Sequence, residues 1–243
     1  MDQSFLPWTP IVAGIVPATI SGVITYLLTR SNFRRELEKV RAGQISTLRK
    51  EHVSPLRYWA SKLSRRLLEI EGKFEKSDYS WVQKCFKAIK DHADGSKRMN
   101  GFPVWCYYEG IFAMTTLYYT CSYIQCSREM RFRLPFSELD PDYSSHMDAH
   151  VETVSLALGG IEGIWDSSQE VLGERFTASG AKMDNDELCR IIDSQDEFKI
   201  APFIRLLDFY IEKLDLSRAR GIRLALDDLI RFLDSRRPPE MRL

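Results

Sequence analysis

The stretch GIFAMTTLYYTCSYIQCS, from Gly110 to Ser127, decides the fold class of this chain. Its eighteen residues carry no charge, which reaches the minimum length of a helix that crosses a membrane. Three tyrosines, three threonines, two serines and a glutamine lie within it, and lipid hydrocarbon offers none of them a hydrogen-bond partner. Neighbouring helices do offer partners, so we expect a helix at the centre of a bundle. A second membrane crossing is the alternative.

Helix start and stop signals lie on both sides of this stretch. Ser54 with Pro55, and Asp140 with Pro141, each predict a helix start, because proline at the first helical position lacks an amide hydrogen that the first turn does not use. Gly159, which a second glycine follows, predicts a helix end.

Apolar residues at helical spacing fill most of the remaining chain, and we find no convincing strand pattern and no internal repeat. Further helices are expected at residues 56–70, 82–89, 161–174, 184–194, 197–214 and 222–233. The first of these should turn Trp59 inward. The predicted fold class is therefore all-α, with a multi-helix bundle over residues 53–235 and a flexible tail at residues 236–243.

An apolar run precedes the bundle. Residues 10–29 are twenty residues without a charge, enough for a helix of about 30 Å, the thickness of a bilayer's hydrocarbon core. Basic residues gather on its C-terminal side, which by the positive-inside rule predicts a single-pass membrane protein with residues 1–9 outside and the bundle in the cytoplasm. A cleaved signal peptide and a buried core helix are the alternatives.

Small residues recur at every fourth position within this run, at Gly14, Ala18 and Gly22. Such a row lets two helix backbones approach closely in lipid, so it predicts packing between copies of the chain and a homo-oligomer. The alternative is chance spacing, because glycine and alanine are common in membrane helices.

A basic segment follows the apolar run. Eleven lysines and arginines face three glutamates between Arg30 and Arg66, whereas residues 67–243 hold seven more acidic than basic side chains. We expect residues 30–52 to form a helical stalk whose basic residues contact anionic lipid. These residues are Arg30, Arg34, Arg35, Lys39 and Arg41. Nucleic acid is the rival partner for such charge, but no recognition motif accompanies it, so no nucleic-acid partner is expected.

Apolar residues also follow a helical spacing through the stalk. They are Phe33, Leu37, Val40, Ile45 and Leu48. The gaps of 4, 3, 5 and 3 residues leave heptad register after Val40, so a long coiled coil is not expected.

Residues with catalytic or metal-binding potential are few. His146 and His150 have the spacing of two zinc ligands on one helix, but Met147 stands where a zincin has its catalytic glutamate. The five cysteines form no CxxC pair, and no nucleophile motif occurs. The sequence therefore predicts no catalytic residue, no cofactor and no metal site, and it does not favour an enzyme.

Acidic residues recur at every fourth position at Glu162, Asp166, Glu170 and Glu174. Like charges at this spacing repel on a helix unless something offsets them. The row therefore predicts an interaction face opposite a basic helix of the same protein, a basic partner or a divalent ion. A solvated helix face is the alternative.

Three classes of function are consistent with these features. The favoured one is a membrane-anchored helical scaffold at the cytoplasmic face, with the bilayer, a second copy of itself and an unidentified protein as partners. The alternative is a membrane-disrupting or pore-forming effector of a defence or toxin system, whose anchors assemble. The weakest is a ligand-binding or enzymatic bundle. Its pocket would be lined by Tyr118, Tyr119, Tyr123, His146 and His150.

Overall fold

A computed structural model describes residues 30–76, 78–93, 108–132, 141–159, 163–164, 166–177, 184–194 and 196–235. These ranges are built from helices and contain no strand, which confirms the all-α prediction. The chain divides into two compact units, Met1–Thr47 and Leu48–Leu243. In the first unit residues 30–47 are helical, and the side chains from 31 to 44 are exposed. The second unit is the multi-helix bundle.

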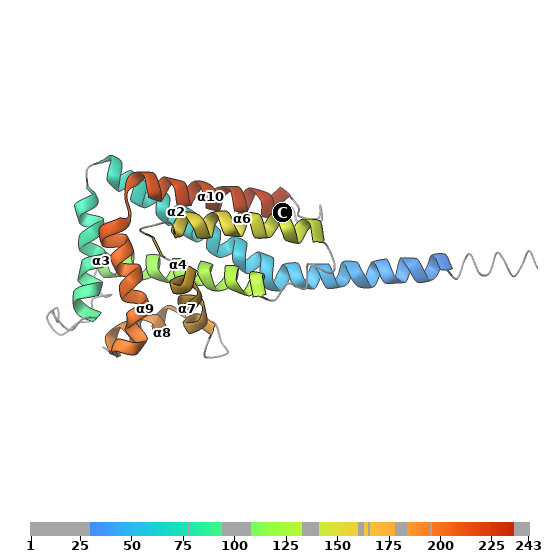
Figure 1. Cartoon of the computed structure of the whole chain (residues 1–243), viewed down its shortest axis with the longest axis horizontal. Coiled ribbons are helices and arrows are strands. Elements are labelled where there is room, and N and C mark those ends of the chain that lie inside the picture. The colour runs from blue at the N-terminus through green and yellow to red at the C-terminus, as the bar shows by residue number, and fades with distance from the viewer. Residues whose placement is uncertain are drawn as a thin grey trace, which may run out of the picture. The chain divides into compact units, whose positions relative to one another are not determined.

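Helix α4, Tyr108–Phe132, is the centre of the bundle. It packs against α2 (Ser54–Glu75), α3 (Tyr79–Ala93) and α7 (Asp166–Thr177), and it crosses the middle of the bundle in Figure 1. Its residues are buried without a break from 120 to 126, so the helix is covered around its whole circumference there. This burial confirms the prediction from the uncharged stretch.

The remaining helices complete the bundle around α4. Helix α10, Leu216–Ser235, packs against both α2 and α6, which spans Pro141–Leu158. These helices run alongside one another in Figure 1. Helices α8 (Asn185–Ser194) and α9 (Glu197–Asp208) follow α7, and a short π-helix, η3 (Phe209–Lys213), extends α9.

The buried threonines of α4 find hydrogen-bond partners inside the bundle, whereas the buried hydroxyl of Tyr123 finds none among the residues that the structure describes. Thr116 donates its hydroxyl to the carbonyl of Phe112, and Thr120 donates to the carbonyl of Thr116. The hydroxyls of Thr120 and Tyr210 also lie 2.7 Å apart. A buried hydroxyl without a partner destabilises a fold, so these bonds explain how the helix tolerates burial.

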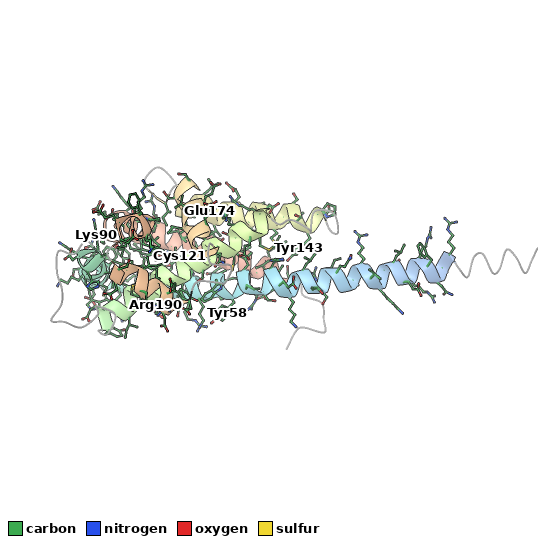
Figure 2. The ribbon with its side chains drawn as sticks, turned by 90° about the horizontal axis from the view of Figure 1, so that it is seen from below. Tyr58, Lys90, Cys121, Tyr143, Glu174 and Arg190 are labelled. Atoms are coloured by element: carbon green, nitrogen blue, oxygen red, sulfur yellow. The ribbon has the colours of Figure 1, made fainter. Side chains whose placement is uncertain are left out.

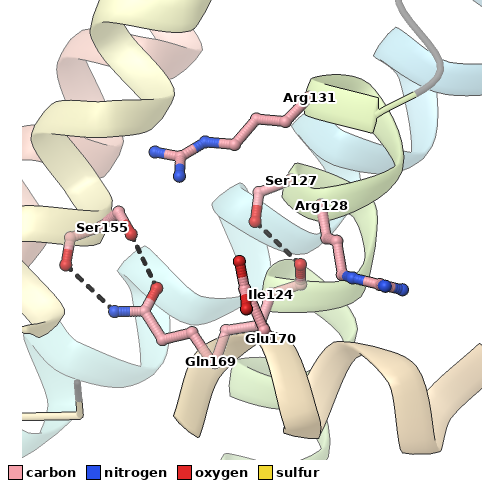
Figure 3. Close-up of a pocket in the computed structure, with 7 residues that line it drawn as sticks. All are labelled: Ile124, Ser127, Arg128, Arg131, Ser155, Gln169 and Glu170. Carbon is pink, nitrogen blue, oxygen red and sulfur yellow. Dashed lines mark hydrogen bonds between the residues drawn. The ribbon is translucent and has the colours of Figure 1, made fainter. Parts of the chain in front are cut away.

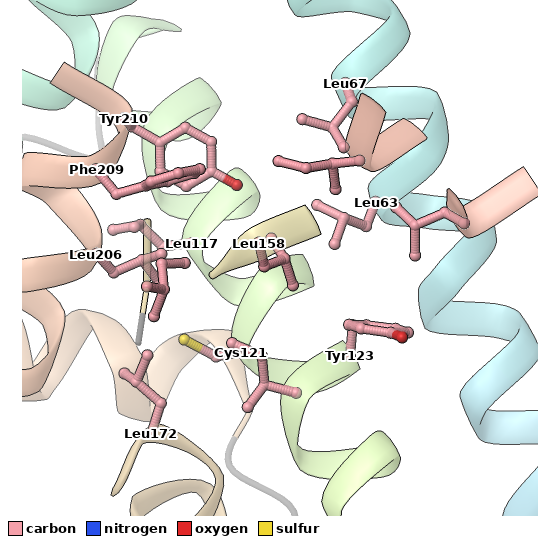
Figure 4. Close-up of a cluster of buried hydrophobic side chains, with 14 of the residues drawn as sticks. Leu63, Leu67, Leu117, Cys121, Tyr123, Leu158, Leu172, Leu206, Phe209 and Tyr210 are labelled. Carbon is pink, nitrogen blue, oxygen red and sulfur yellow. The ribbon is translucent and has the colours of Figure 1, made fainter. Parts of the chain in front are cut away.

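Two sides of α4 build the core (Figure 4). Cys121 faces α9 and α7, where Leu206 and Leu172 lie. Tyr123 lies on the other side, toward Leu63 of α2. All of these side chains are buried, so one helix joins the two halves of the hydrophobic core.

The predicted membrane localisation is corrected by this structure. None of the helices in the described ranges has both the length and the apolar character that a bilayer crossing requires. That includes α4, whose tyrosine, threonine and glutamine side chains dilute its hydrophobicity. A single-pass protein with its N-terminus outside is therefore not supported. Residues 10–29, to which the crossing was assigned, lie outside the described residues, as do residues 1–9 and 236–243.

The predicted helix start at Ser54 matches the first residue of α2, but helical structure does not begin there. The chain is already helical before it, in the π-helix η1 (Arg49–Val53), and the amide of Ser54 donates to the carbonyl of Arg49, five residues back. Pro55 lacks an amide hydrogen and crowds the preceding turn. A widened turn relieves that crowding inside a helix, so the proline marks a π-bulge rather than a start.

Proline begins one of the later helices, and glycine lies inside another. Helix α6 begins at Pro141 and ends at Leu158, as predicted. Helix α7 begins at Asp166 rather than at residue 161, and Gly173 lies inside it. A Cβ atom at Gly173 would lie 2.9 Å from Cδ of Arg128, so this glycine permits close packing between α7 and α4.

An ionic seam joins α2 to α10. Glu71 is only 4% exposed and accepts from Arg223, with Nε 2.5 Å from Oε1. Arg223 also donates to Asp227 at 2.9 Å, and Asp227 accepts from Ser64 at 2.5 Å. The hydrogen bond to Glu71 raises the pKa of Arg223 above its ordinary value. The seam therefore fixes the position of α10 against α2.

We expect the Glu71→Gln substitution to lower the free energy of unfolding by about 1–3 kcal/mol, because it removes the charge of a buried carboxylate that pairs with both Arg223 and Arg220. Chemical denaturation of the full chain measures this change. Glu75→Gln is the matched control, since Glu75 is exposed and pairs with Arg220, and its effect should stay within about 0.5 kcal/mol. Equal effects of the two substitutions would contradict the assigned role of the seam.

Candidate functional site

Aromatic side chains of α2 and α4 meet at the surface of the bundle. The rings of Trp59 and Tyr118 lie 5.2 Å apart and nearly perpendicular, at 87°. The ring of Tyr58 lies 4.8 Å from Trp59, and that of Tyr119 lies 6.1 Å from it. Edge-to-face contacts of this kind are favourable because the positive edge of one ring meets the negative face of the other.

Basic side chains lie over these rings. The guanidinium of Arg66 is 4.4 Å from the ring centre of Phe112 and 5.7 Å from that of Tyr119. Arg66 also donates to the carbonyl of Phe112 at 3.2 Å, so its position is fixed. The ammonium of Lys62 lies 5.4 Å from the ring centre of Tyr58. Cation–π attraction thus holds both cations on the aromatic cluster.

The cluster continues onto α3. The ring of Trp81 lies 5.0 Å from Phe112 and 5.6 Å from Tyr108, and the ammonium of Lys73 lies 4.7 Å from the ring centre of Trp81. We call the whole set the aromatic–basic face. It comprises Tyr58, Trp59, Lys62, Arg66, Lys73, Trp81, Tyr108, Phe112, Tyr118 and Tyr119.

Two layers make up this face. Phe112 is buried, and Trp59, Trp81, Tyr118 and Tyr119 are half-buried. Above them Tyr58 is 50% exposed and Tyr108 70% exposed; Figure 2 labels Tyr58 at the edge of the bundle. Exposed tyrosines on a packed base resemble the residues that contribute most to protein–protein binding, where tryptophan, tyrosine and arginine are enriched.

The hydroxyl of Tyr118 stays protonated at neutral pH. Burial raises its pKa, against the opposing effect of its hydrogen bond to Ser122, and the negative charge of Asp184 raises the pKa further.

A cavity of about 310 Å³ adjoins the face. Ile111, Met114 and Thr115 of α4 form one wall of it, and residues of α8 form the other. The α8 residues are Asn185, Asp186, Cys189, Arg190 and Asp193. Ile111, Thr115 and Tyr118 follow one another at helical spacing, so one stripe of α4 connects this cavity with the rings around Trp59.

A second, smaller cavity of about 80 Å³ lies among α4, α6 and α7 (Figure 3). The amide of Gln169 donates to the carbonyls of Ser155 and Ile164 and accepts from the hydroxyl of Ser155. Ser127 donates to the carbonyl of Ile124. Both serine hydroxyls are thus used in structural bonds, so this cavity offers no activated nucleophile.

The predicted acidic row lies partly at this small cavity. Glu174 pairs with Arg128 of α4 at 2.8 Å, and Glu170 lines the cavity beside Arg128 and Arg131. Two arginines at the C-terminal end of α4 therefore lie beside these two carboxylates. Glu162 and the side chain of Asp166 lie outside the described residues.

The tyrosines and histidines proposed for a ligand pocket are not brought together. Tyr118 and Tyr119 meet Trp59, whereas the rings of His146 and His150 lie 6.4 and 4.9 Å from Phe232 of α10. Tyr123 is buried in the core, and none of the five lines either cavity. Within the described ranges no three metal-ligating side chains gather.

The residues predicted to act at a membrane belong to the first unit. The basic residues are exposed on its helix; they are Arg30, Arg34, Arg35, Lys39 and Arg41. The small-residue row of Gly14, Ala18 and Gly22 lies outside the described residues.

Sequence reasoning missed the aromatic–basic face. It assigned Trp59 to the buried stripe of α2, whereas this ring is only half-buried. One local signal was present, because Tyr58 adjoins Trp59 and Lys62 follows at helical spacing. The partners on α4 lie about sixty residues further along the chain and carry no such signal.

Comparisons with known protein families, with curated proteins and with solved structures gave no significant match.

We expect Arg66→Ala to lower the free energy of unfolding by about 1–3 kcal/mol, because it removes a charged hydrogen bond and cation–π contacts that are partly shielded from water. Urea denaturation of the full chain measures the change. Arg65→Ala removes the same charge from an exposed neighbour and should cost no more than about 0.5 kcal/mol. If both variants behave alike, Arg66 does not organise the face.

Proposed function

We propose that this protein is a helical interaction module that binds another protein through the aromatic–basic face. The observation that carries the proposal is the pair of exposed tyrosines, Tyr58 and Tyr108, held on a packed base of tryptophan, tyrosine and arginine. Rigid aromatic groups lose little conformational freedom when they are covered, so they bind a partner efficiently. Ile111, which is 49% exposed, adds an apolar anchor point between the rings and the larger cavity.

The charges around the face favour a protein over a nucleic acid. Lys62, Arg66 and Lys73 lie on the aromatic side. Asp186 and Asp193 line the adjoining cavity, together with Arg190. A groove that binds a phosphate backbone is positive along its length. The two carboxylates would instead repel the phosphates. A peptide segment can present both signs of charge.

The same arrangement describes the partner segment. Its apolar side chain would enter the cavity beside Ile111 and Met114, and its acidic side chains would face Lys62 and Arg66. Basic side chains on its other edge would face Asp186 and Asp193. An amphipathic helix laid along the exposed stripe of α4 meets all three conditions.

The test uses the full chain as bait for cross-linked partners in its native cell, followed by binding measurements with the partner recovered. We expect the Tyr58→Ala/Tyr108→Ala variant to bind that partner at least about tenfold more weakly, since two exposed anchor residues are lost. Leu156→Ala/Leu224→Ala is the matched control, because these leucines are also exposed, at 62% and 48%, on other helices, and binding should persist. Unchanged binding by the tyrosine variant, or no recovered partner, would refute the proposal.

A further inference from the structure

The helix of residues 30–47 presents an apolar row to solvent. Phe33 is 60% exposed, Leu37 53% and Val40 58%. Gaps of four and three residues place these side chains on one face of the helix. This spacing is that of the core positions of a two-stranded coiled coil, with Leu37 at an a position and its two neighbours at d positions.

Charged residues flank the apolar row in a complementary way. Glu36 falls at the g position before Leu37, and Arg41 falls at the e position after Val40. Two parallel helices place the g residue of one chain beside the e residue that lies five positions later in the other. Glu36 of each copy therefore faces Arg41 of the other, and the pairing occurs twice by symmetry.

An antiparallel pair has the opposite electrostatics. It places e positions beside e positions, so Arg34 of one copy would lie near Arg41 of the other. Like charges across such an interface repel and select against that orientation. The charge pattern thus distinguishes the two orientations, which an apolar row alone would not do.

We infer that the helix of residues 30–47 pairs in parallel and in register with the same helix of a second copy of this chain. The next core position is the polar Gln44, and Leu48 packs against the core of the second unit, so the paired row ends by residue 44. Three apolar core positions form a short interface, and the dimer is expected to be weak and concentration-dependent. This surface is separate from the aromatic–basic face, and the inference does not rest on the proposed partner binding.

Charge reversal tests the orientation of the pair. Sedimentation equilibrium of the full chain should show that Glu36→Arg and Arg41→Glu each weaken the dimer by about fivefold or more, because each replaces two attractions with two repulsions. The double reversal, Glu36→Arg/Arg41→Glu, should restore the wild-type affinity within about twofold. A tighter dimer with Arg41→Glu alone would indicate antiparallel pairing and overturn the inference, as would a wild-type chain that stays monomeric.

Disulfide cross-linking tests the register independently. A Val40→Cys chain should form a symmetric disulfide under mild oxidation, because the two d positions face each other at a distance that a disulfide spans. Lys39→Cys, which points away from the pair, is the control and should cross-link no more than the parent chain. Equal cross-linking at both positions would overturn the inference even if both variants dimerise.

Discussion

The burial of α4 is the constraint on which the rest of the structure depends. This helix has polar groups around most of its circumference, and residues 120–126 are nevertheless all buried. Burial of that kind is stabilised where the polar groups find hydrogen-bond partners. Thr120 meets Tyr210, and helices α2, α3 and α7 cover the remaining sides. Three surrounding helices therefore take part in the burial of this one segment.

The same helix carries the candidate interaction surface on its outer edge. Phe112 anchors the rings of Trp81 and the cation of Arg66, while Ile111 turns toward the larger cavity. Adjacent residues of α4 thus serve the core and the surface. A partner bound at this face would contact side chains whose positions the core already fixes, so little ordering would be needed on binding.

The sequence predicted features that arise from local chemistry. The uncharged but polar stretch of Gly110 to Ser127 predicted a central helix, and Pro141 predicted the start of α6. Features that depend on contacts between distant segments were not predictable. Pro55 reads as a helix start unless the preceding turn is known to be helical, and Trp59 reads as core unless the position of α4 is known. The ion pair of Glu174 with Arg128 shows how a repulsive row on one helix is offset by another.

Native-state hydrogen exchange of the full chain tests the central role of α4 most directly. The account predicts that the amides of residues 116–126 exchange only through global unfolding and are the slowest in the protein, because opening them exposes both halves of the core. Helix α8, which is short and packs on one side, should exchange through smaller openings. If residues 116–126 exchanged as fast as α8, the bundle would not be organised around α4, and the account would be contradicted.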